Sequence, residues 1–285
     1  MKFRSSDQDC PACGCHVKPA PLYWKAGYQI LRCSECGLGR TALDSRFDPG
    51  GIYSSDYFLG NQTDGYADYI GSGRVLRKEF RRVVNSLRRQ GRTSGKLLEI
   101  GCAYGFFLLE AREYFDVHGI EISVEAAAHC QSQGLDVVSG IVTEERVAQH
   151  APLDVVVLLD VIEHLTNPLE VLRMVHANLN VGGHIVITTG DWDSILSRLM
   201  GSAWRLMTPP QHVFFFSRRT MRATLSRAGF RVVQVSRPVK FVPLSLVLFQ
   251  LARIVGLPTR NISCLARWTI PINLFDAMRI IAVKV

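Results

Sequence analysis

The sequence lacks the features that direct a chain out of the cell or into a bilayer. Its first residues, MKFRSSDQDCPACG, contain no apolar core of a secretory signal. No stretch reaches the roughly 18 uninterrupted apolar residues that a spanning helix needs. The nearest one, Phe241 to Leu257, is interrupted by Pro243, Gln250 and Arg253. We therefore expect a cytoplasmic protein without a transmembrane segment.

Internal repeats and low-complexity tracts are also absent, and charge is moderate. The chain has 285 residues, of which 47% are hydrophobic and 20% charged, a composition typical of globular proteins and not of disordered ones. The segment from Arg74 to Lys96 accounts for the whole net charge of +8, because it contains nine arginines and lysines and a single acid, Glu79. Apolar residues recur there at helical spacing, which predicts an amphipathic helix.

Cysteine is scarce outside one region. The pairs Cys10/Cys13 and Cys33/Cys36 are two C-x-x-C motifs with nineteen residues between them, the spacing of structural four-cysteine zinc sites. Four thiolates leave no open position for a catalytic water, so the predicted role of the zinc is structural. Cys15 and His16 form no further pair and are not included. Residues 1–45 are thus predicted to form a zinc-ribbon-like module.

The rest of the chain alternates short apolar runs with helical segments. A connector and the basic helix are expected at 46–92, and the main domain at 93–285. Alternation of this kind predicts an α/β fold with a parallel sheet and helices on both faces, a Rossmann-like core. Strands are predicted at Lys96–Ile100, Val117–Ile122, Leu135–Val138, Leu153–Leu159, His184–Thr188, Phe230–Val235 and Arg279–Val285, and helices at Tyr104–Tyr114, Val124–Gln133, Pro168–Leu179 and Arg218–Ala228.

The passage Leu97-Leu-Glu-Ile-Gly-Cys-Ala-Tyr-Gly-Phe-Phe is the most informative one. It is a strand that enters a turn with Gly101 and Gly105, where the backbone can approach a ligand at the carboxyl end of the sheet. Glu99 precedes this turn, and Glu121 ends the next strand, where an acid can bind both ribose hydroxyls of an adenosine. A dinucleotide site competes with this interpretation, but the chain has no G-x-G-x-x-G. A carboxylate ahead of the glycines also suits a ligand with a cationic head better than a pyrophosphate.

These residues resemble the class I S-adenosylmethionine-dependent methyltransferases, and the resemblance spans about Leu97 to Gly190. It implies a mostly parallel seven-stranded sheet and S-adenosylmethionine as the cofactor. Residues near Gly140 to Val142 would flank the adenine, although no acid stands at Ile141 or Val142. The residues that the resemblance assigns to cofactor binding are Glu99, Gly101, Cys102, Ala103, Tyr104, Gly105, Glu121, Ile122, Asp160 and Val161.

Two further segments resemble one branch of that family, which acts mostly on small molecules. Asp160-Val-Ile-Glu-His-Leu-Thr-Asn-Pro is similar to its D-V-x-E-H-L-x-x-P signature, and Gln211-His-Val-Phe-Phe-Phe-Ser to its His-x-x-x-Phe-Ser strand start. The pattern recurs in enzymes of sugar, polysaccharide and natural-product pathways. The resemblance thus implies a small-molecule or saccharide acceptor. Asp160-Val-Ile-Glu is not the Pro-Pro-aromatic motif of enzymes that methylate exocyclic amines.

His164 and His212 are the candidate catalytic bases for O-methylation. An imidazole has an unperturbed pKa of about 6.5 and accepts protons near neutral pH. The competing interpretation is structural: His164 orients the loop after the strand, and His212 satisfies buried backbone groups. Residues 236–276 are expected to cap the acceptor pocket, or to touch a membrane surface if the acceptor is lipid-linked.

Two other functions stay open. In the first, the zinc module and the basic helix 74–96 bind RNA, which the arginine-rich face favours because arginines neutralise phosphates. In the second, the chain is a non-catalytic protein that binds partners through its zinc module. Glu99, Gly101, Gly105 and Glu121 argue against loss of the catalytic site.

Overall fold

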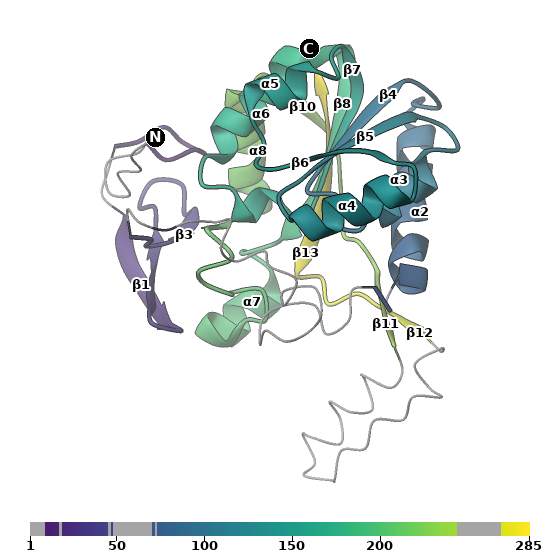
Figure 1. The fold of residues 1–285 in the computed structure, drawn as a ribbon. Helices are drawn as coiled ribbons and strands as arrows, with labels where there is room; N and C mark the ends of the chain where they lie inside the picture. Colours follow the sequence, from purple (N-terminus) through teal and green to yellow (C-terminus); the bar gives the residue numbers. More distant parts are fainter. Residues whose placement is uncertain (1–8, 17–18, 45–46, 48–69, 72, 244–268) are drawn as a thin grey trace.

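The computed structural model describes residues 9–16, 19–44, 47, 70–71, 73–243 and 269–285, and its centre is a seven-stranded sheet (Figure 1). The strand order is β10-β13-β8-β7-β4-β5-β6, and β13 alone among them runs against its neighbours. The predicted mostly parallel seven-stranded, Rossmann-like sheet is therefore confirmed. The strands are β4 (Lys96–Ile100), β5 (Asp116–Glu121), β6 (Asp136–Ser139), β7 (Leu153–Leu159), β8 (Leu179–Gly190), β10 (Phe230–Ser236) and β13 (Ala277–Lys284).

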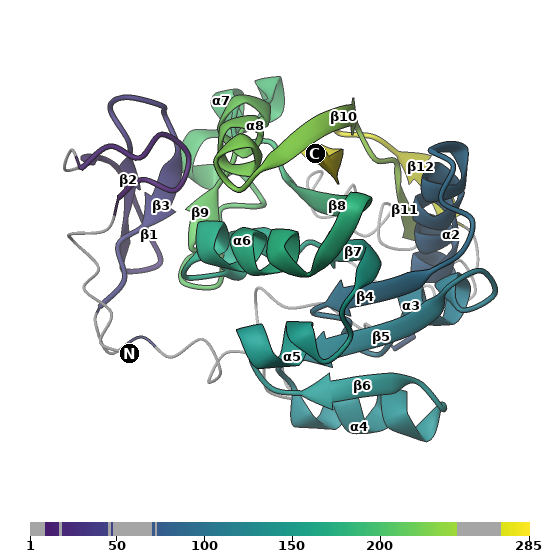
Figure 2. The same cartoon turned by 90° about the horizontal axis from the view of Figure 1, so that it is seen from above.

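Alternating residues of the central strands supply two separate cores. Leu97 of β4 packs with the helices on one face of the sheet and Leu98 with those on the other, as the period of two in a strand requires. Figure 2 shows the sheet between these two groups of helices. One group is α2 (Gly73–Arg89), α3 (Phe106–Ala111) and α4 (Val124–Ser132); the other is α5 (Glu144–Ala148), α6 (Pro168–Asn178) and α8 (Arg218–Arg227).

The basic amphipathic helix is present as α2. Its apolar side buries Val83, Val84 and Leu87 against the sheet and α3. Arg77 and Arg81 both donate to the buried carboxylate of Glu110 on α3, the latter over 2.8 Å. Part of the basic face therefore fixes α2 to α3.

The N-terminal strands form a second sheet with a strand from the main domain. Its order is β1 (Ala20–Lys25), β2 (Tyr28–Arg32), β3 (Gly39–Thr41) and β9 (Phe214–Phe215). Ile30 of β2 packs with Trp192, Trp204 and Phe215 in a small apolar cluster. The sheet thus crosses residue 45, the boundary expected from the sequence, and couples the first strands to the segment that precedes α8.

That preceding segment carries short elements that the sequence did not predict. They are the 3-10 turn η2 (Ile162–His164), helix α7 (Ile195–Met200) and the 3-10 turn η3 (Gly201–Ala203). Asp276 holds the segment in place, because its carboxylate accepts hydrogen bonds from Trp204 Nε1 at 3.1 Å and Arg205 Nη2 at 2.9 Å.

The expected cap at 236–276 is described only at its base. There β11 (Lys240–Pro243) and β12 (Thr269–Ile272) form an antiparallel two-stranded ladder. Most of the segment Phe241 to Leu257, and with it the expectation of a cap or a membrane contact, lies outside the described residues. Within the described ranges, no helix has the length and apolar character needed to cross a membrane.

Candidate functional site

The turn between β4 and α3 has the backbone conformation that its glycines suggest. Gly101 and Gly105 both have φ of +73°, and Ala103 between them has φ of +47°. Gly101 N donates to Ile120 O on β5 at 2.7 Å, and Gly105 N donates to Cys102 O at 2.8 Å. The turn is therefore built by its own backbone and by the neighbouring strand.

Side chains at the two glycine positions would collide with their surroundings. A Cβ atom at Gly101 would lie 2.6 Å from Val161, and one at Gly105 would lie 2.6 Å from Leu135. Only glycine therefore lets the β4 turn lie this close to the end of β7 and to α4.

Glu121, at the end of β5, is joined directly to this turn. One carboxylate oxygen accepts from Ala103 N at 2.7 Å and the other from Ser123 N at 2.8 Å. The residue is 3% exposed, and burial raises the pKa of its carboxyl while the two backbone donors lower it. Each oxygen keeps a second lone pair, so the carboxylate can also accept from a vicinal diol.

Glu99 lies beneath the same turn in a drier environment. It is 2% exposed, and its Oε2 atom has no hydrogen-bond partner. Burial raises the pKa of this carboxyl well above its usual range, and the charge of Glu121 adds to the effect. A buried acid without a partner is destabilising, and a cationic group above the turn would offset that cost.

The other predicted cofactor residues surround these two acids. Cys102 and Tyr104 are buried, and the ring of Tyr104 meets that of His129 edge to face at 5.1 Å. Ile122 follows Glu121 directly and is partly exposed. At the end of β6, Gly140 N donates to Glu121 O at 2.7 Å, which brings the predicted adenine side next to the predicted ribose site.

Asp160 and Val161 leave the end of β7 on the other side of the turn. Asp160 has φ of +56°, and its carboxylate accepts from Thr188 Oγ1 of β8 at 2.9 Å. Val161 packs against Gly101, as the glycine contacts require. The structure therefore brings all ten predicted cofactor residues to one edge of the sheet, the carboxyl ends of β4, β5 and β7.

His164 and His212 lie together beside this edge, with their rings perpendicular at 4.6 Å. His164 Nδ1 donates to Gln211 O at 2.9 Å and His212 Nδ1 to Leu206 O at 2.7 Å. Carbonyl oxygens only accept, so the neutral ring of His212 has its proton on Nδ1 and an unprotonated Nε2. The ring of His164 makes a further hydrogen bond, to the backbone of Asp160. Burial lowers the pKa of His164 to about 4 and, together with the charge of His164, that of His212 to about 3. Both rings are therefore neutral at neutral pH.

Three groups of side chains in the described part of the chain could hold a metal ion, with one ligand atom from each member within 4.8 Å of the others. They are Cys10, Cys13, Cys15 and Cys33; Glu163, His164 and His212; and His118, Asp136 and His150. The second group coincides with the candidate bases, whose imidazoles and carboxylate are also ordinary metal ligands.

Three of the four predicted cysteines meet in one group with Cys15, and Cys36 lies next to Cys10. Cys10 Sγ lies 3.5 Å from Cys36 Sγ, and Cys13 Sγ lies 3.7 Å from Cys33 Sγ. Cys15, which the sequence analysis left out, places its Sγ atom 3.4 Å from that of Cys33. The spacing of the cysteines in the sequence did not predict this contact, because it depends on the turn after Cys13, which brings Cys15 toward the second C-x-x-C turn.

The two C-x-x-C turns have matching backbones. Gly14 N donates to Cys10 O at 2.8 Å, and Gly37 N donates to Cys33 O at 2.9 Å, with φ of +74° and +78° at the two glycines. A side-chain hydrogen bond with Cys36 lowers the pKa of Cys10 to about 5. These are properties that suit thiolate ligands.

Helix α8 fastens this cysteine cluster to the main domain. Arg227 Nη1 donates to Cys10 O at 2.7 Å and to Pro11 O at 2.9 Å, and Arg219 donates to Cys36 O. Each C-x-x-C turn is therefore hydrogen-bonded to its own arginine of α8.

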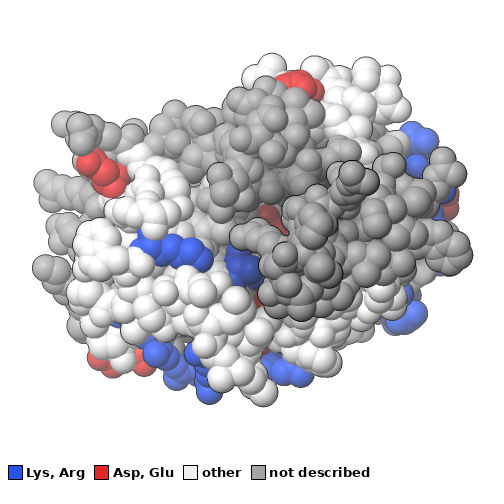
Figure 3. Space-filling view, turned by 90° about the horizontal axis from the view of Figure 1, so that it is seen from below, with Lys and Arg blue, Asp and Glu red and all other residues white. Residues whose placement is uncertain are grey.

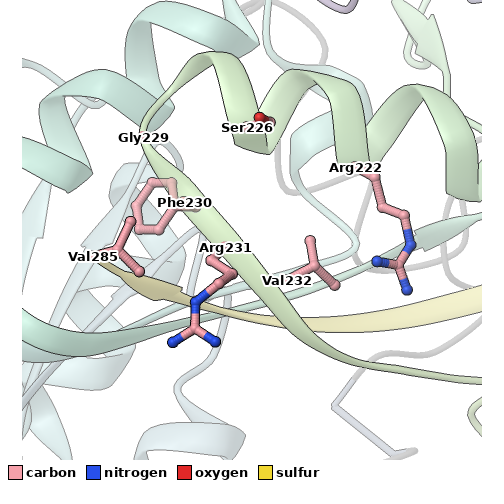
Figure 4. Close-up of a pocket in the computed structure, with 7 residues that line it drawn as sticks. All are labelled: Arg222, Ser226, Gly229, Phe230, Arg231, Val232 and Val285. Carbon is pink, nitrogen blue, oxygen red and sulfur yellow. The ribbon is translucent and has the colours of Figure 1, made fainter.

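Charge at the carboxyl edge is mixed. Seen from that edge, the described surface carries acidic and basic atoms next to each other near its middle (Figure 3). A separate depression of about 460 Å³ lies between α8 and β10, lined by Phe230, Val232 and Val285, with Arg222 and Arg231 extending from helix and strand (Figure 4). It is remote from the β4 turn, and we assign it no role.

Comparisons with known proteins agree with this geometry. A family model described as a methyltransferase domain matches residues 73–235. The ubiquinone biosynthesis O-methyltransferase of Aeromonas salmonicida is 28% identical over 162 residues, which cover 53% of this chain and 68% of that protein. The enzyme of the same description from Caulobacter vibrioides is 37% identical over 100 residues, which cover 33% of this chain and 40% of that protein.

Among solved structures, the magnesium protoporphyrin IX methyltransferase of Synechocystis PCC 6803 with bound SAH superposes with a TM-score of 0.53. The match covers 82% of this chain and 97% of that one at 13% sequence identity, a likeness of fold alone. The chain spans only 40% to 68% of the length of the two O-methyltransferases named above.

Proposed function

Since the chain belongs to the methyltransferase domain family, the class I S-adenosylmethionine-dependent enzymes, we propose that it transfers a methyl group from S-adenosylmethionine to a hydroxyl group of a small-molecule or saccharide acceptor. The names of the O-methyltransferases that it resembles support oxygen as the methylated atom. The D-V-x-E-H-L-x-x-P segment at Asp160 supports the small acceptor.

The observation that carries the proposal is the joining of Glu121 to the β4 turn. Its carboxylate fixes Ala103 N and, in the proposed complex, accepts from the ribose hydroxyls with its remaining lone pairs. Glu99 faces the cationic amino-acid end of the cofactor, which would restore its charged form. Gly101, Cys102, Ala103, Tyr104 and Gly105 form the surface against which the cofactor lies, with Ile122, Asp160 and Val161 at its sides.

The bound cofactor supplies a methyl group that its sulfonium already activates, so the protein has to align the acceptor and remove one proton. His212 is the better base, because its Nδ1 is held by Leu206 O and leaves Nε2 unprotonated, whereas His164 makes hydrogen bonds to two backbone groups, at Gln211 and Asp160. A weakly basic imidazole suffices, since the oxygen becomes far more acidic as it gains the methyl group. His164 packs against His212 and orients it.

The second part of the proposal is a structural zinc ion at the N-terminal cysteines. The two C-x-x-C turns present Cys10, Cys13, Cys33 and Cys36. The Sγ atoms of Cys10 and Cys36 are 3.5 Å apart and those of Cys13 and Cys33 are 3.7 Å apart, distances that suit thiolates around one ion. Cys15 is the alternative fourth ligand. The ion would hold together the two C-x-x-C turns of a module that has no large apolar core of its own, and Arg219 and Arg227 connect these turns to α8.

RNA binding is the alternative function, and the contacts of the basic segment weigh against it. Arg77 and Arg81 pair with Glu110, Arg88 lies over the ring of Tyr114 at 4.3 Å, and Arg92 donates to His184 at 3.0 Å. These arginines serve the packing of α2 and the sheet. A non-catalytic interaction protein is disfavoured by the intact turn and its two acids.

The test is methyl transfer by the zinc-replete enzyme to a panel of phenols, saccharides and RNA, read as release of S-adenosylhomocysteine. We expect turnover with a hydroxyl acceptor. The His212→Asn variant should lower kcat by about 10² to 10⁴-fold, the usual contribution of a general base, with cofactor affinity unchanged. His176→Asn, a lone histidine on α6, is the matched control.

Salt-sensitive turnover of RNA alone would instead support the alternative function. An unchanged kcat in the His212→Asn variant would refute the base. Loss of turnover in EDTA, with the module's zinc retained, would indicate that Glu163, His164 and His212 act by holding a cation.

A further inference from the structure

A third group of potential ligands lies at the opposite end of the sheet from the β4 turn. His118 is the third residue of β5, Asp136 is the first residue of β6, and the two are register partners across the strands. His150 follows α5, a helix that lies near the amino ends of the parallel strands (Figure 1). The proposed methyl transfer uses none of these side chains.

The side chains are already arranged around a common point. His118 Nδ1 lies 2.7 Å from Asp136 Oδ2, and His118 Nε2 lies 3.3 Å from Asp116 Oδ2. The ring of His150 stacks on that of His118, with centroids 4.4 Å apart and planes inclined by 28°. Ligand atoms of His118, Asp136 and His150 all fall within 4.8 Å of one another.

Ring nitrogens here are buried without hydrogen bonds. The Nε2 atoms of both His118 and His150 are inaccessible to solvent and make no hydrogen bond. His118 Nε2 has only the ion-pair contact with Asp116, and His150 Nε2 has no hydrogen-bond partner in the described part of the chain. Buried polar atoms nearly always have such a partner, so the His150 nitrogen points to a missing one.

Charge and access also favour a cation. The side chains of Asp116 and Asp136 are 63% and 60% exposed, so an ion can reach the histidines from solvent. Lys96, the register partner of Asp116, contributes one positive charge near the site, against the two carboxylates of Asp116 and Asp136.

We propose that His118, His150 and Asp136, assisted by Asp116, bind a divalent transition-metal ion. Two imidazoles with one or two carboxylates are the donor set of zinc and nickel and not of magnesium or calcium. The ion would connect β5, β6 and the end of α5. Strand β6 lies at the edge of the seven-stranded sheet, where β5 is its one neighbouring strand. Its role is structural, because the site is at the amino end of the sheet and the cofactor residues are at the carboxyl end.

The test is uptake of nickel by the full chain with its cysteine module loaded with zinc. The number of nickel ions that stay bound to each chain after gel filtration is measured for the wild type, for the His118→Asn/His150→Asn double variant and for Asp136→Asn. His176→Asn is the matched control, because His176 also has a buried Nε2 without a hydrogen bond but no carboxylate beside it. We expect one nickel more in the wild type and control than in the double variant, and about 10- to 100-fold weaker binding in Asp136→Asn.

A second measurement does not depend on any variant folding. In the wild type, paramagnetic nickel should broaden the ring NMR signals of His118 and His150 first. Equal uptake by the wild type and the double variant, or broadening confined to other histidines such as His164 and His212, would overturn the proposal.

Discussion

The β4 turn and the cysteine module are both built on glycines with positive φ, yet different forces hold them. The turn lies between two large cores and is fixed by β5, through Ile120 O and the carboxylate of Glu121. The module has no large core of its own: Ile30 lies in a small apolar cluster with residues of the main domain, and Ala12, Cys33 and Leu38 pack against the main core. Its sheet is completed by β9, and its cysteine turns are hydrogen-bonded to α8. The turn is preorganised by the fold, whereas the proposed zinc ion would add to the stability of the module.

The largest effect should follow from removing a thiol from the module. Cys33→Ser should lose the zinc ion and lower the free energy of unfolding by about 3 kcal/mol or more, since structural zinc contributes directly to folding. Cys15→Ser should keep one zinc and lose little stability. Elemental analysis and thermal unfolding of both variants provide the measurement.

Equal zinc content in Cys33→Ser and the wild type would contradict this account of the module. Loss of zinc in Cys15→Ser but not in Cys36→Ser would move the fourth ligand from Cys36 to Cys15.

A smaller and more local effect is expected in the turn. Gly105→Ala should cost about 1–2 kcal/mol for its left-handed backbone, and its new methyl would also meet Leu135 at 2.6 Å and Cys130 at 2.9 Å. We expect cofactor affinity to fall at least about tenfold. Gly134→Ala is the matched control, because Gly134 has nearly the same φ, +72°, and nothing within 4 Å of an added Cβ.

Both glycine variants should be titrated calorimetrically with S-adenosylmethionine. Both share the strain of a left-handed backbone, but only Gly105→Ala should also displace the β4 turn, so the comparison separates the two effects. Similar affinity losses in Gly105→Ala and Gly134→Ala would mean that the turn has no special part in cofactor binding.

The last effect depends on pH and concerns the two histidines beside the site. Their pKa values in the folded protein, about 4 and about 3, lie below the unfolded value of 6.5, so the unfolded chain binds more protons. Stability should therefore fall as pH decreases from about 6.5 toward 4, by up to about 1.4 kcal/mol per pH unit for each ring. Urea unfolding at pH 7, 6 and 5 should show a shallower slope in His212→Asn. An identical slope would mean that His212 titrates normally.

The sequence predicted the centre of the fold better than its margins. The bounds of β4 and β7 were predicted without error, because both strands are short, mostly apolar segments of the buried centre of the sheet. The helix predicted at Tyr104–Tyr114 is shorter, Phe106–Ala111, since the left-handed turn extends through Gly105. The strand predicted at His184–Thr188 is longer, because Gly182 and Gly183 lie within β8 and not in a loop.

Features made by distant parts of the chain were not predicted. No local pattern marks the pairing of β3 with β9, whose partners Gly39 and Phe215 are far apart in sequence. Cys15 was left out because it makes no C-x-x-C pair, although the fold brings it to Cys33. The ten residues predicted to bind the cofactor lie together at one edge because the parallel sheet itself fixes where its strands end. Their role in cofactor binding stays a prediction.

The measurement that tests the central claim most directly is calorimetric titration of the zinc-replete protein with S-adenosylmethionine, beside Glu121→Ala and the surface control Glu170→Ala. The account predicts micromolar binding by the wild type and the control, and about 10- to 100-fold weaker binding by Glu121→Ala, because a charged hydrogen-bond acceptor to the ribose is lost. Equal affinity of all three proteins, or no binding by the wild type, would contradict it.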